Sequence, residues 1–148
     1  MKKISSEIEI NASSERVWET LSDKSALPDW NPFIRLIEGD LSVGERLKVY
    51  IKASKGMAMT FKPTVLAAEP NREFRWIGRF LMPGLMDEEH SFVIESLGDG
   101  RVRFVQSEAF RGVLVPLMAA MGVFQNAHLG FGEMNQALKL RSEQATPQ

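Results

Sequence analysis

The sequence contains no cysteine, and this absence excludes several kinds of chemistry. Without thiols the protein has no disulfide, no thiolate nucleophile and no zinc site built on cysteine. It has only two histidines, so a metal site would depend on His90, His128 and Glu108, whose spacing matches no metal-binding motif. No glycine-rich phosphate loop of the GxGxxG type is present either. We therefore expect neither a metal nor a cofactor.

Long apolar runs and an excess of one charge are also missing. No apolar stretch reaches the ~18 residues that suggest a membrane-spanning helix, so we expect no integral membrane association. The N-terminal "MKKISSEIEI" has no apolar core of the kind found in signal peptides, which favours a cytoplasmic protein. The formal net charge of -1 gives no electrostatic reason to expect nucleic acid as a partner.

What the sequence does contain suits one domain over residues 1–148, with 44% hydrophobic residues to form a core. Alternation of apolar and polar residues predicts strands. The predicted strands span residues 4–10, 34–38, 46–53, 59–67, 73–81, 88–96 and 101–110. Pro63 lies in the middle of one of them, which indicates an edge strand or a bulge.

Two regions have helical spacing instead. "NASSERVWETLSD" follows the first strand and has Ser13 or Ser14 as a plausible N-cap. Apolar residues three and four apart predict one long helix over residues 113–141. Because short turns join consecutive strands, the sheet should be antiparallel. We predict an α+β fold: a curved seven-stranded antiparallel sheet around a long C-terminal helix, with two short helices after the first strand.

Several segments are similar to those of one superfamily. They are "ERVWETLSD", "WNPFI", "VGERLKV", "EPNREFRWIGRF", "QSEAFRGVLVPL" and "FGEMNQALKLRSE". Over residues 4–143 the chain resembles the START/Bet v 1-like (SRPBCC) superfamily, and within it the polyketide cyclase/dehydrase-like family. The resemblance implies a helix-grip fold with a deep cavity between the sheet and the C-terminal helix. Some members are enzymes and many are only carriers, so the fold does not fix the function.

Strand and helix periodicity identify the side chains that would line such a cavity. Those that we predict to bind a ligand are Phe61, Trp76, Phe80, His90, Phe92, Gln106, Glu108, Phe110, Met118, Met121, Phe124 and His128. The set is rich in aromatic residues and methionine, and the flexible Met side chain suits varied apolar ligands. The same residues would also fill an ordinary core, and His128 on an apolar stripe is more typical of a core histidine. It is the resemblance that favours a cavity.

The polar members of this set are the candidates for chemistry. If the last hairpin closes over a loop centred on Asp99, His90 lies directly across from Glu108. A His–Glu pair in apolar surroundings can act as general acid and base. It can equally orient a hydroxyl or carbonyl group of a ligand, or be a structural or solvated pair. The sequence leaves these interpretations open.

Two connections carry large apolar side chains. "PDWNPF" contains Trp30 and Phe33, and "FLMPGLM" starts at Phe80. Apolar loops stiffened by proline suit the mouth of a cavity, so we predict that Trp30 and Phe33 contact a ligand there. Two other interpretations exist: the first loop plugs the core beneath the first helices, or the loops form a homodimer contact.

Taken together, the sequence favours binding of a small hydrophobic molecule, lipid-, polyketide- or aromatic-like, by a carrier or sensor. One alternative is a cyclase- or dehydratase-type enzyme that uses His90 and Glu108 as acid and base. Another is an interaction module similar to the Hsp90 co-chaperone-like members, which predicts a collapsed cavity and a large exposed patch. Whether any reaction is catalysed stays open.

Overall fold

The computed structural model describes residues 1–52 and 58–144, which form eight strands and a set of helices. The strands are β1 (Lys2–Ile10), β2 (Ile34–Glu38), β3 (Lys48–Lys52), β4 (Ala58–Phe61), β5 (Thr64–Glu69), β6 (Glu73–Arg79), β7 (Asp87–Gly98) and β8 (Arg101–Arg111). The helices are α1 (Ser14–Ser22), the 3-10 helix η1 (Lys24–Ala26), α2 (Leu27–Trp30), α3 (Val115–Ala120) and α4 (Val123–Glu143). Ala53, the last residue of one predicted strand, lies outside the described residues.

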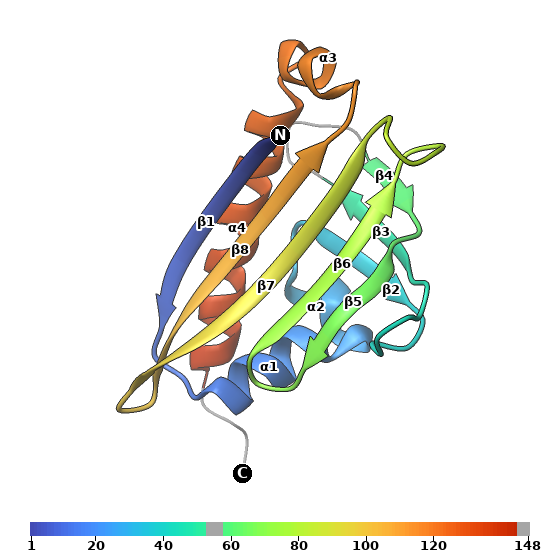
Figure 1. The fold of residues 1–148 in the computed structure, drawn as a ribbon. Helices are drawn as coiled ribbons and strands as arrows, with labels where there is room; N and C mark the ends of the chain where they lie inside the picture. The colour runs from blue at the N-terminus through green and yellow to red at the C-terminus, as the bar shows by residue number, and fades with distance from the viewer. Residues whose placement is uncertain (53–57, 145–148) are drawn as a thin grey trace.

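The strands form two antiparallel sheets rather than one (Figure 1). The larger has the order β1-β8-β7-β6-β5 and the smaller the order β2-β3-β4. The prediction of seven strands was wrong because residues 59–67 divide at Pro63 into β4 and β5. Proline has no N–H to donate to a strand ladder, so a continuous strand is interrupted there.

The two sheets nevertheless meet beside this proline. The Pro63 carbonyl accepts a hydrogen bond from the Leu47 N–H at 2.8 Å, and the Val65 N–H donates to the Glu45 carbonyl at 2.9 Å. An isolated bridge between Arg46 and Thr64 lies between these two bonds. The residues just before β3, 45–47, therefore join the edge of the larger sheet.

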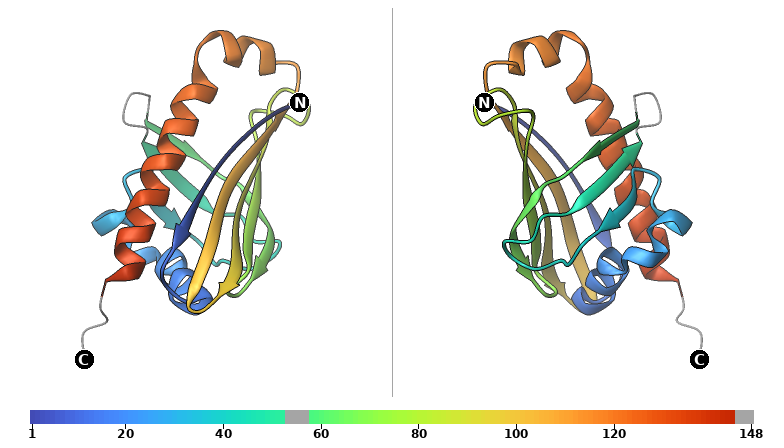
Figure 2. Two further views of the ribbon diagram at one scale, coloured as in Figure 1. Left: turned by 90° about the vertical axis from the view of Figure 1, so that its left-hand side faces the viewer. Right: turned by 90° about the vertical axis from the view of Figure 1, so that its right-hand side faces the viewer.

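The predicted long helix is two helices that meet at Gly122. This glycine has a φ of 74°, a left-handed conformation that breaks the helical path. Pro116 lies in the first turn of α3, where its missing N–H costs nothing. Side views show α4 on the concave side of the larger sheet and α3 above the end of that sheet, where it leads from β8 to α4 (Figure 2). No helix within the described residues is long and apolar enough to span a membrane.

The segment between β1 and β2 closes the lower part of the interior. Ser13 is the N-cap of α1, as predicted, and its Oγ accepts a hydrogen bond from the Arg16 N–H at 3.1 Å. Phe33 is buried against α4, with its ring 5.7 Å from that of Phe131, edge to face. A Cβ at Gly130 would lie 2.5 Å from the Phe33 ring, so this glycine allows the close approach.

Candidate functional site

Strands β7 and β8 bring His90 and Glu108 together on the inner face of the larger sheet. The register pairs these two residues directly, as expected for closure over Asp99. The Nδ1 atom of His90 lies 3.2 Å from Oε2 of Glu108, and both side chains are buried. Gly98, Asp99 and Gly100 all have positive φ, which fixes the tight turn and therefore the pairing above it.

A chain of hydrogen bonds continues from His90 to α4 and β1. The His90 Nε2 atom lies 2.9 Å from Oε1 of Gln106, and the Gln106 amide donates to Oδ1 of Asn135 at 2.9 Å. Asn135 in turn donates to the Ser6 hydroxyl at 3.3 Å. Because the amide oxygen of Gln106 only accepts, Nε2 of His90 must carry a hydrogen.

This tautomer determines where the next proton lies. A contact between Nδ1 of His90 and a carboxylate is favourable only if one proton lies between the two atoms. The pair is therefore either an imidazolium beside a carboxylate or a neutral imidazole beside a carboxylic acid. Both arrangements hold one transferable proton, which is what acid–base chemistry or recognition of a polar ligand group requires.

Glu88 adds a second carboxyl group to the same wall. It is half-buried in β7, two residues before His90, and it pairs across the sheet with Phe110. Burial, with the nearby charge of Glu108 as a second cause, raises the pKa of Glu88 to about 8. The side chain is thus largely protonated at neutral pH. Sequence reasoning missed this residue, although it shares the parity of His90 in a strand predicted to begin there.

Aromatic rings separate the His90–Glu108 pair from the rest of the interior. The His90 ring stacks on Phe92 at 4.5 Å between centroids, and Trp76 and Phe131 lie at 5.4 Å and 4.9 Å. Across residues 1–52 and 58–144, no group of three or more acidic or histidine side chains is arranged to hold a metal ion. The site is therefore a proton-carrying polar chain within an aromatic wall.

A small apolar cavity lies on the other side of this wall. Its volume is about 20 Å³, which is room for about one water molecule. The lining residues are Trp18, Leu21, Ser22, Leu27, Asn31, Ile34, Ile37, Leu41, Phe74, Trp76, Phe92 and Met134. The cavity therefore lies between the larger sheet, α4 and the segment from α1 to β2.

Asn31 is a polar side chain in this lining, and no sequence pattern singles it out. It is fully buried, and its Oδ1 atom accepts hydrogen bonds from the N–H groups of Phe33 and Ile34, each at 2.9 Å. These two donors fix the orientation of the amide. Its Nδ2 atom is buried and has no hydrogen-bond partner among the described residues.

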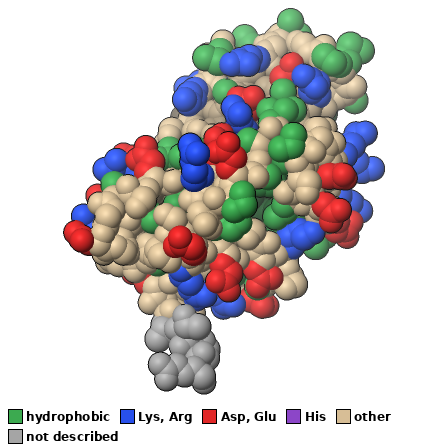
Figure 3. Space-filling view, turned by 60° about the horizontal axis from the view of Figure 1, so that its bottom comes forward, with side chains coloured by type: hydrophobic (Ala, Val, Ile, Leu, Met, Phe, Trp, Pro, Cys, Tyr) green, Lys and Arg blue, Asp and Glu red, His purple; other side chains and the backbone are tan. Residues whose placement is uncertain are grey.

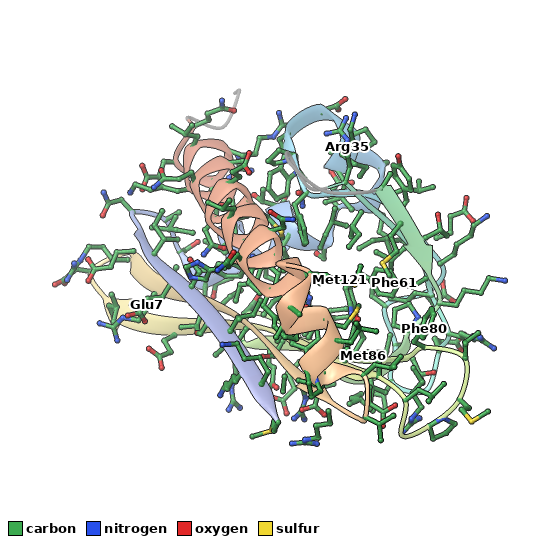
Figure 4. The ribbon with its side chains drawn as sticks, turned by 90° about the horizontal axis from the view of Figure 1, so that it is seen from above. Glu7, Arg35, Phe61, Phe80, Met86 and Met121 are labelled. Atoms are coloured by element: carbon green, nitrogen blue, oxygen red, sulfur yellow. The ribbon has the colours of Figure 1, made fainter. Side chains whose placement is uncertain are left out.

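The structure places most of the predicted ligand-binding residues on the inner face, although no ligand tests their role. Those buried there are Trp76, His90, Phe92, Gln106, Glu108, Phe110 and Phe124, with Phe61 and Met118 half-buried beside the core. Figure 4, which looks down on the α3 end, shows Met121, Phe61, Phe80 and Met86 on the side of α4 toward the smaller sheet.

Three predicted residues are exposed rather than inward-facing. Phe80 follows the end of β6 at Arg79, so strand alternation no longer fixes its direction. Met121 is the C-cap of α3, where the helical path changes. His128 lies beside β1, and its Nε2 atom is 3.2 Å from the Ser5 carbonyl oxygen. The prediction that these three side chains face inward was wrong. For Phe80 and Met121 the periodic pattern was extended past the end of an element, and for His128 it was assigned to the wrong face of the helix.

The two apolar loops do not form one mouth. Phe33 plugs the interior against α4, and Trp30 is half-buried in a groove with Arg16 and Arg141. The "FLMPGLM" loop lies at the opposite end, beside α3 (Figure 1). The plug interpretation therefore describes the first loop, and the shared mouth was wrong.

Comparisons with known proteins agree with this architecture. The sequence profile of a family described as "Polyketide cyclase / dehydrase and lipid transport" matches residues 1–139. No curated protein sequence matches the chain significantly.

Solved structures with the same fold cover nearly the whole chain. The Zhui aromatase/cyclase from Streptomyces sp. R1128 has a TM-score of 0.76 at 15% identity, over 96% of this chain and 93% of that one. A START superfamily protein from Mycobacterium smegmatis has a TM-score of 0.73 at 23% identity, over 95% and 97%. A Chromobacterium violaceum protein has a TM-score of 0.72 at 22% identity, over 97% and 98%. At these identities the likeness concerns the fold alone.

Proposed function

Because the chain belongs to the polyketide cyclase/dehydrase and lipid transport family, we propose that it binds a small hydrophobic molecule as a carrier or sensor. The ligand occupies the space between the larger sheet and the segment from α1 to β2. It carries an oxygen atom that accepts a hydrogen bond from Asn31. The interior lining, which is almost entirely apolar, supports a ligand that is otherwise hydrophobic.

The unpartnered amide of Asn31 is the observation that carries this proposal. A buried N–H group without an acceptor costs about 1–3 kcal/mol, so folded proteins rarely leave one. The orientation of the amide is fixed, and the side chain cannot rotate to satisfy the donor without losing two hydrogen bonds. A ligand carbonyl or hydroxyl oxygen in the adjoining cavity would provide the acceptor.

The cavity must widen to admit such a ligand, and its two walls differ in how easily they move. Trp76 and Phe92 are fully buried on strands that are hydrogen-bonded on both sides. Leu21, Ile37 and Leu41, on the opposite wall, are only half-buried. Movement of the wall between α1 and β2 therefore breaks fewer contacts, and we place the entry of the ligand there.

An acid–base enzyme is the second candidate, and the His90–Glu108 contact at 3.2 Å favours it. In such an enzyme, the proton shared by His90 and Glu108 moves to or from a carbonyl group of the substrate. The rings of Trp76 and Phe92 stand between the cavity and His90, so a substrate must displace them to reach the proton. The carrier function needs no such displacement, and for this reason we favour it.

Native mass spectrometry of the purified protein tests the proposal. We expect a small molecule to co-purify with the wild-type protein. It should be lost in Leu21→Trp, because the indole ring is larger than the leucine side chain and fills the cavity from the half-buried wall. Leu140→Trp is the matched control, because Leu140 is exposed and does not line the cavity. A bound molecule retained equally by both variants would contradict this site. With the ligand identified, Glu108→Gln should abolish turnover in an enzyme but leave binding by a carrier nearly unchanged, because Glu108 does not line the cavity.

A further inference from the structure

The end of the molecule that carries α3 exposes an unusual number of large apolar side chains. We call this region the α3-end surface and define it by Phe80, Leu81, Met82, Val113, Leu117 and Met121. Their exposed fractions run from 51% for Phe80 to 81% for Leu81. Large apolar residues gathered on a monomer surface usually mark an interaction site.

Two segments far apart in the sequence build this surface as one unit. The N–H groups of Val113 and Leu114 donate to the carbonyls of Gly84 and Leu85, at 3.1 Å and 3.0 Å. A Cβ at Gly112, which has a φ of 132°, would lie 2.3 Å from the Leu85 carbonyl oxygen, so only glycine permits this contact. The exposed residues are therefore held together by backbone hydrogen bonds.

The charge pattern around the surface is distinctive. Residues 80–86 and 112–132 contain no Asp, Glu, Lys or Arg at all. The strand ends beneath them carry Lys2, Lys3, Arg79 and Arg111. Among the first residues of β7, Asp87 lies 3.8 Å from Arg79 and offsets its charge, and Glu89 adds a second acidic side chain. Burial raises the pKa of Glu88, which keeps that side chain largely uncharged, so basic residues still outnumber charged acidic ones here. This end is thus cationic, although the whole chain has a net charge of -1.

We propose that the α3-end surface docks on the surface of an anionic lipid bilayer. Apolar side chains enter the boundary between headgroups and acyl chains, and Lys2, Lys3 and Arg111 face the anionic headgroups. The views of the fold support this geometry, since α3 and the β6–β7 loop project from one end of the molecule, next to the N-terminal strand (Figures 1 and 2).

A second copy of the chain fits this surface less well. A twofold contact would bring the cations of both copies together, with like charges opposed around an apolar centre. The space-filling view shows apolar side chains along its upper edge, the α3 end, with charged side chains directly beneath them, and further apolar side chains near the centre of this face (Figure 3). An anionic bilayer matches both the exposed apolar side chains and the basic residues of this end.

The absence of cysteine makes a site-specific test direct. Leu81→Cys is labelled with an environment-sensitive fluorophore and mixed with phosphatidylcholine vesicles, with and without phosphatidylglycerol. We expect a blue shift with the anionic vesicles and a much smaller one with phosphatidylcholine alone. Leu140→Cys, which is 67% exposed on α4 and outside the surface, should show no shift. A shift equal at both positions, or at neither, would overturn the proposal.

Vesicle flotation of the unlabelled protein gives an independent measurement. The double variant Lys3→Gln/Arg111→Gln should lower affinity for anionic vesicles about 5-fold for each cation removed. Leu81→Glu/Leu117→Glu should abolish flotation, and Leu140→Glu should leave it unchanged. Melting curves check that the variants remain folded. Flotation unaffected by all of these changes contradicts docking at this end, as does a lipid-independent dimer that Leu81→Glu disrupts.

Discussion

At the scale of single residues, the His90–Glu108 pair could be predicted from the sequence, whereas the buried amide of Asn31 could not. Strand parity placed His90 opposite Glu108 on the condition that the hairpin closes over Asp99, and the observed register meets this condition. The same parity would have included Glu88. Asn31 is different, because its buried amide depends on a turn packed between helices and a sheet that the sequence does not reveal.

The protonation of Glu88 gives a pH-dependent stability. Its pKa is about 8 in the folded protein, against an ordinary value of 4.5, so the folded state holds the proton more tightly. This contribution to stability is complete below about pH 4.5 and is lost as the pH rises to about 8. We expect a loss on the order of 2 kcal/mol over this range, because partial exposure moderates the effect.

Urea unfolding of Glu88→Gln at a series of pH values measures this contribution. The difference between the wild-type and variant curves should slope through the range from pH 4.5 to 8 and flatten above it. Glu89→Gln is the control, since its side chain lies on the other face of β7 and should leave the wild-type slope unchanged. Parallel curves for the wild type and Glu88→Gln would show that Glu88 ionises normally.

At the scale of secondary structure elements, periodicity predicted the strands and helices but not where they break. Pro63 divides one predicted strand, and Gly122 divides the predicted helix. Both residues were visible as interruptions, yet each is also compatible with a bulge or a bend. Tertiary packing decides whether the chain bends or breaks at such a residue. On either side of Pro63, β4 belongs to the smaller sheet and β5 to the larger one, so the predicted strand is broken there.

Helix α4 offers a matched pair of glycines to test its packing. Gly130→Ala places a methyl group 2.5 Å from the Phe33 ring, and we expect a destabilisation of about 1–3 kcal/mol. Gly132→Ala meets no atom within 4 Å and should stabilise the helix by about 0.5–1 kcal/mol. Chemical denaturation measures both. Phe33→Leu should recover part of the loss in Gly130→Ala, and equal effects at the two glycines would contradict the close contact.

At the scale of the whole molecule, the resemblance indicated the helix-grip arrangement, which the structure shows with two sheets in place of one. It could not give the interior volume, because that depends on how Phe33, Trp76 and Phe92 pack. The small cavity and the exposed α3-end surface are the features that the interaction-module alternative predicted. The buried unpartnered donor of Asn31 is what favours ligand binding instead.

The meeting of the two sheets at Arg46 and Thr64 provides a test of the assembled fold. The hydrogen bonds of Leu47 and Val65 flank this pair, so Arg46 and Thr64 face each other as a non-hydrogen-bonded pair with closely spaced Cα atoms. Such spacing accepts a disulfide. In a chain with no other cysteine, Arg46→Cys/Thr64→Cys should therefore oxidise cleanly to a single intramolecular bond.

The bond should raise the free energy of unfolding by about 3 kcal/mol, because it closes a short loop in the unfolded chain. Mass spectrometry detects the bond, and melting curves with and without a reductant measure its effect. Lys48→Cys/Thr64→Cys is the control, since Lys48 pairs with Glu38 on β2 and should not reach residue 64. If only the control oxidised, the smaller sheet would be shifted by two residues along the larger one. The wall between α1 and β2 would then be displaced, and the cavity beside Asn31 would have to be redrawn.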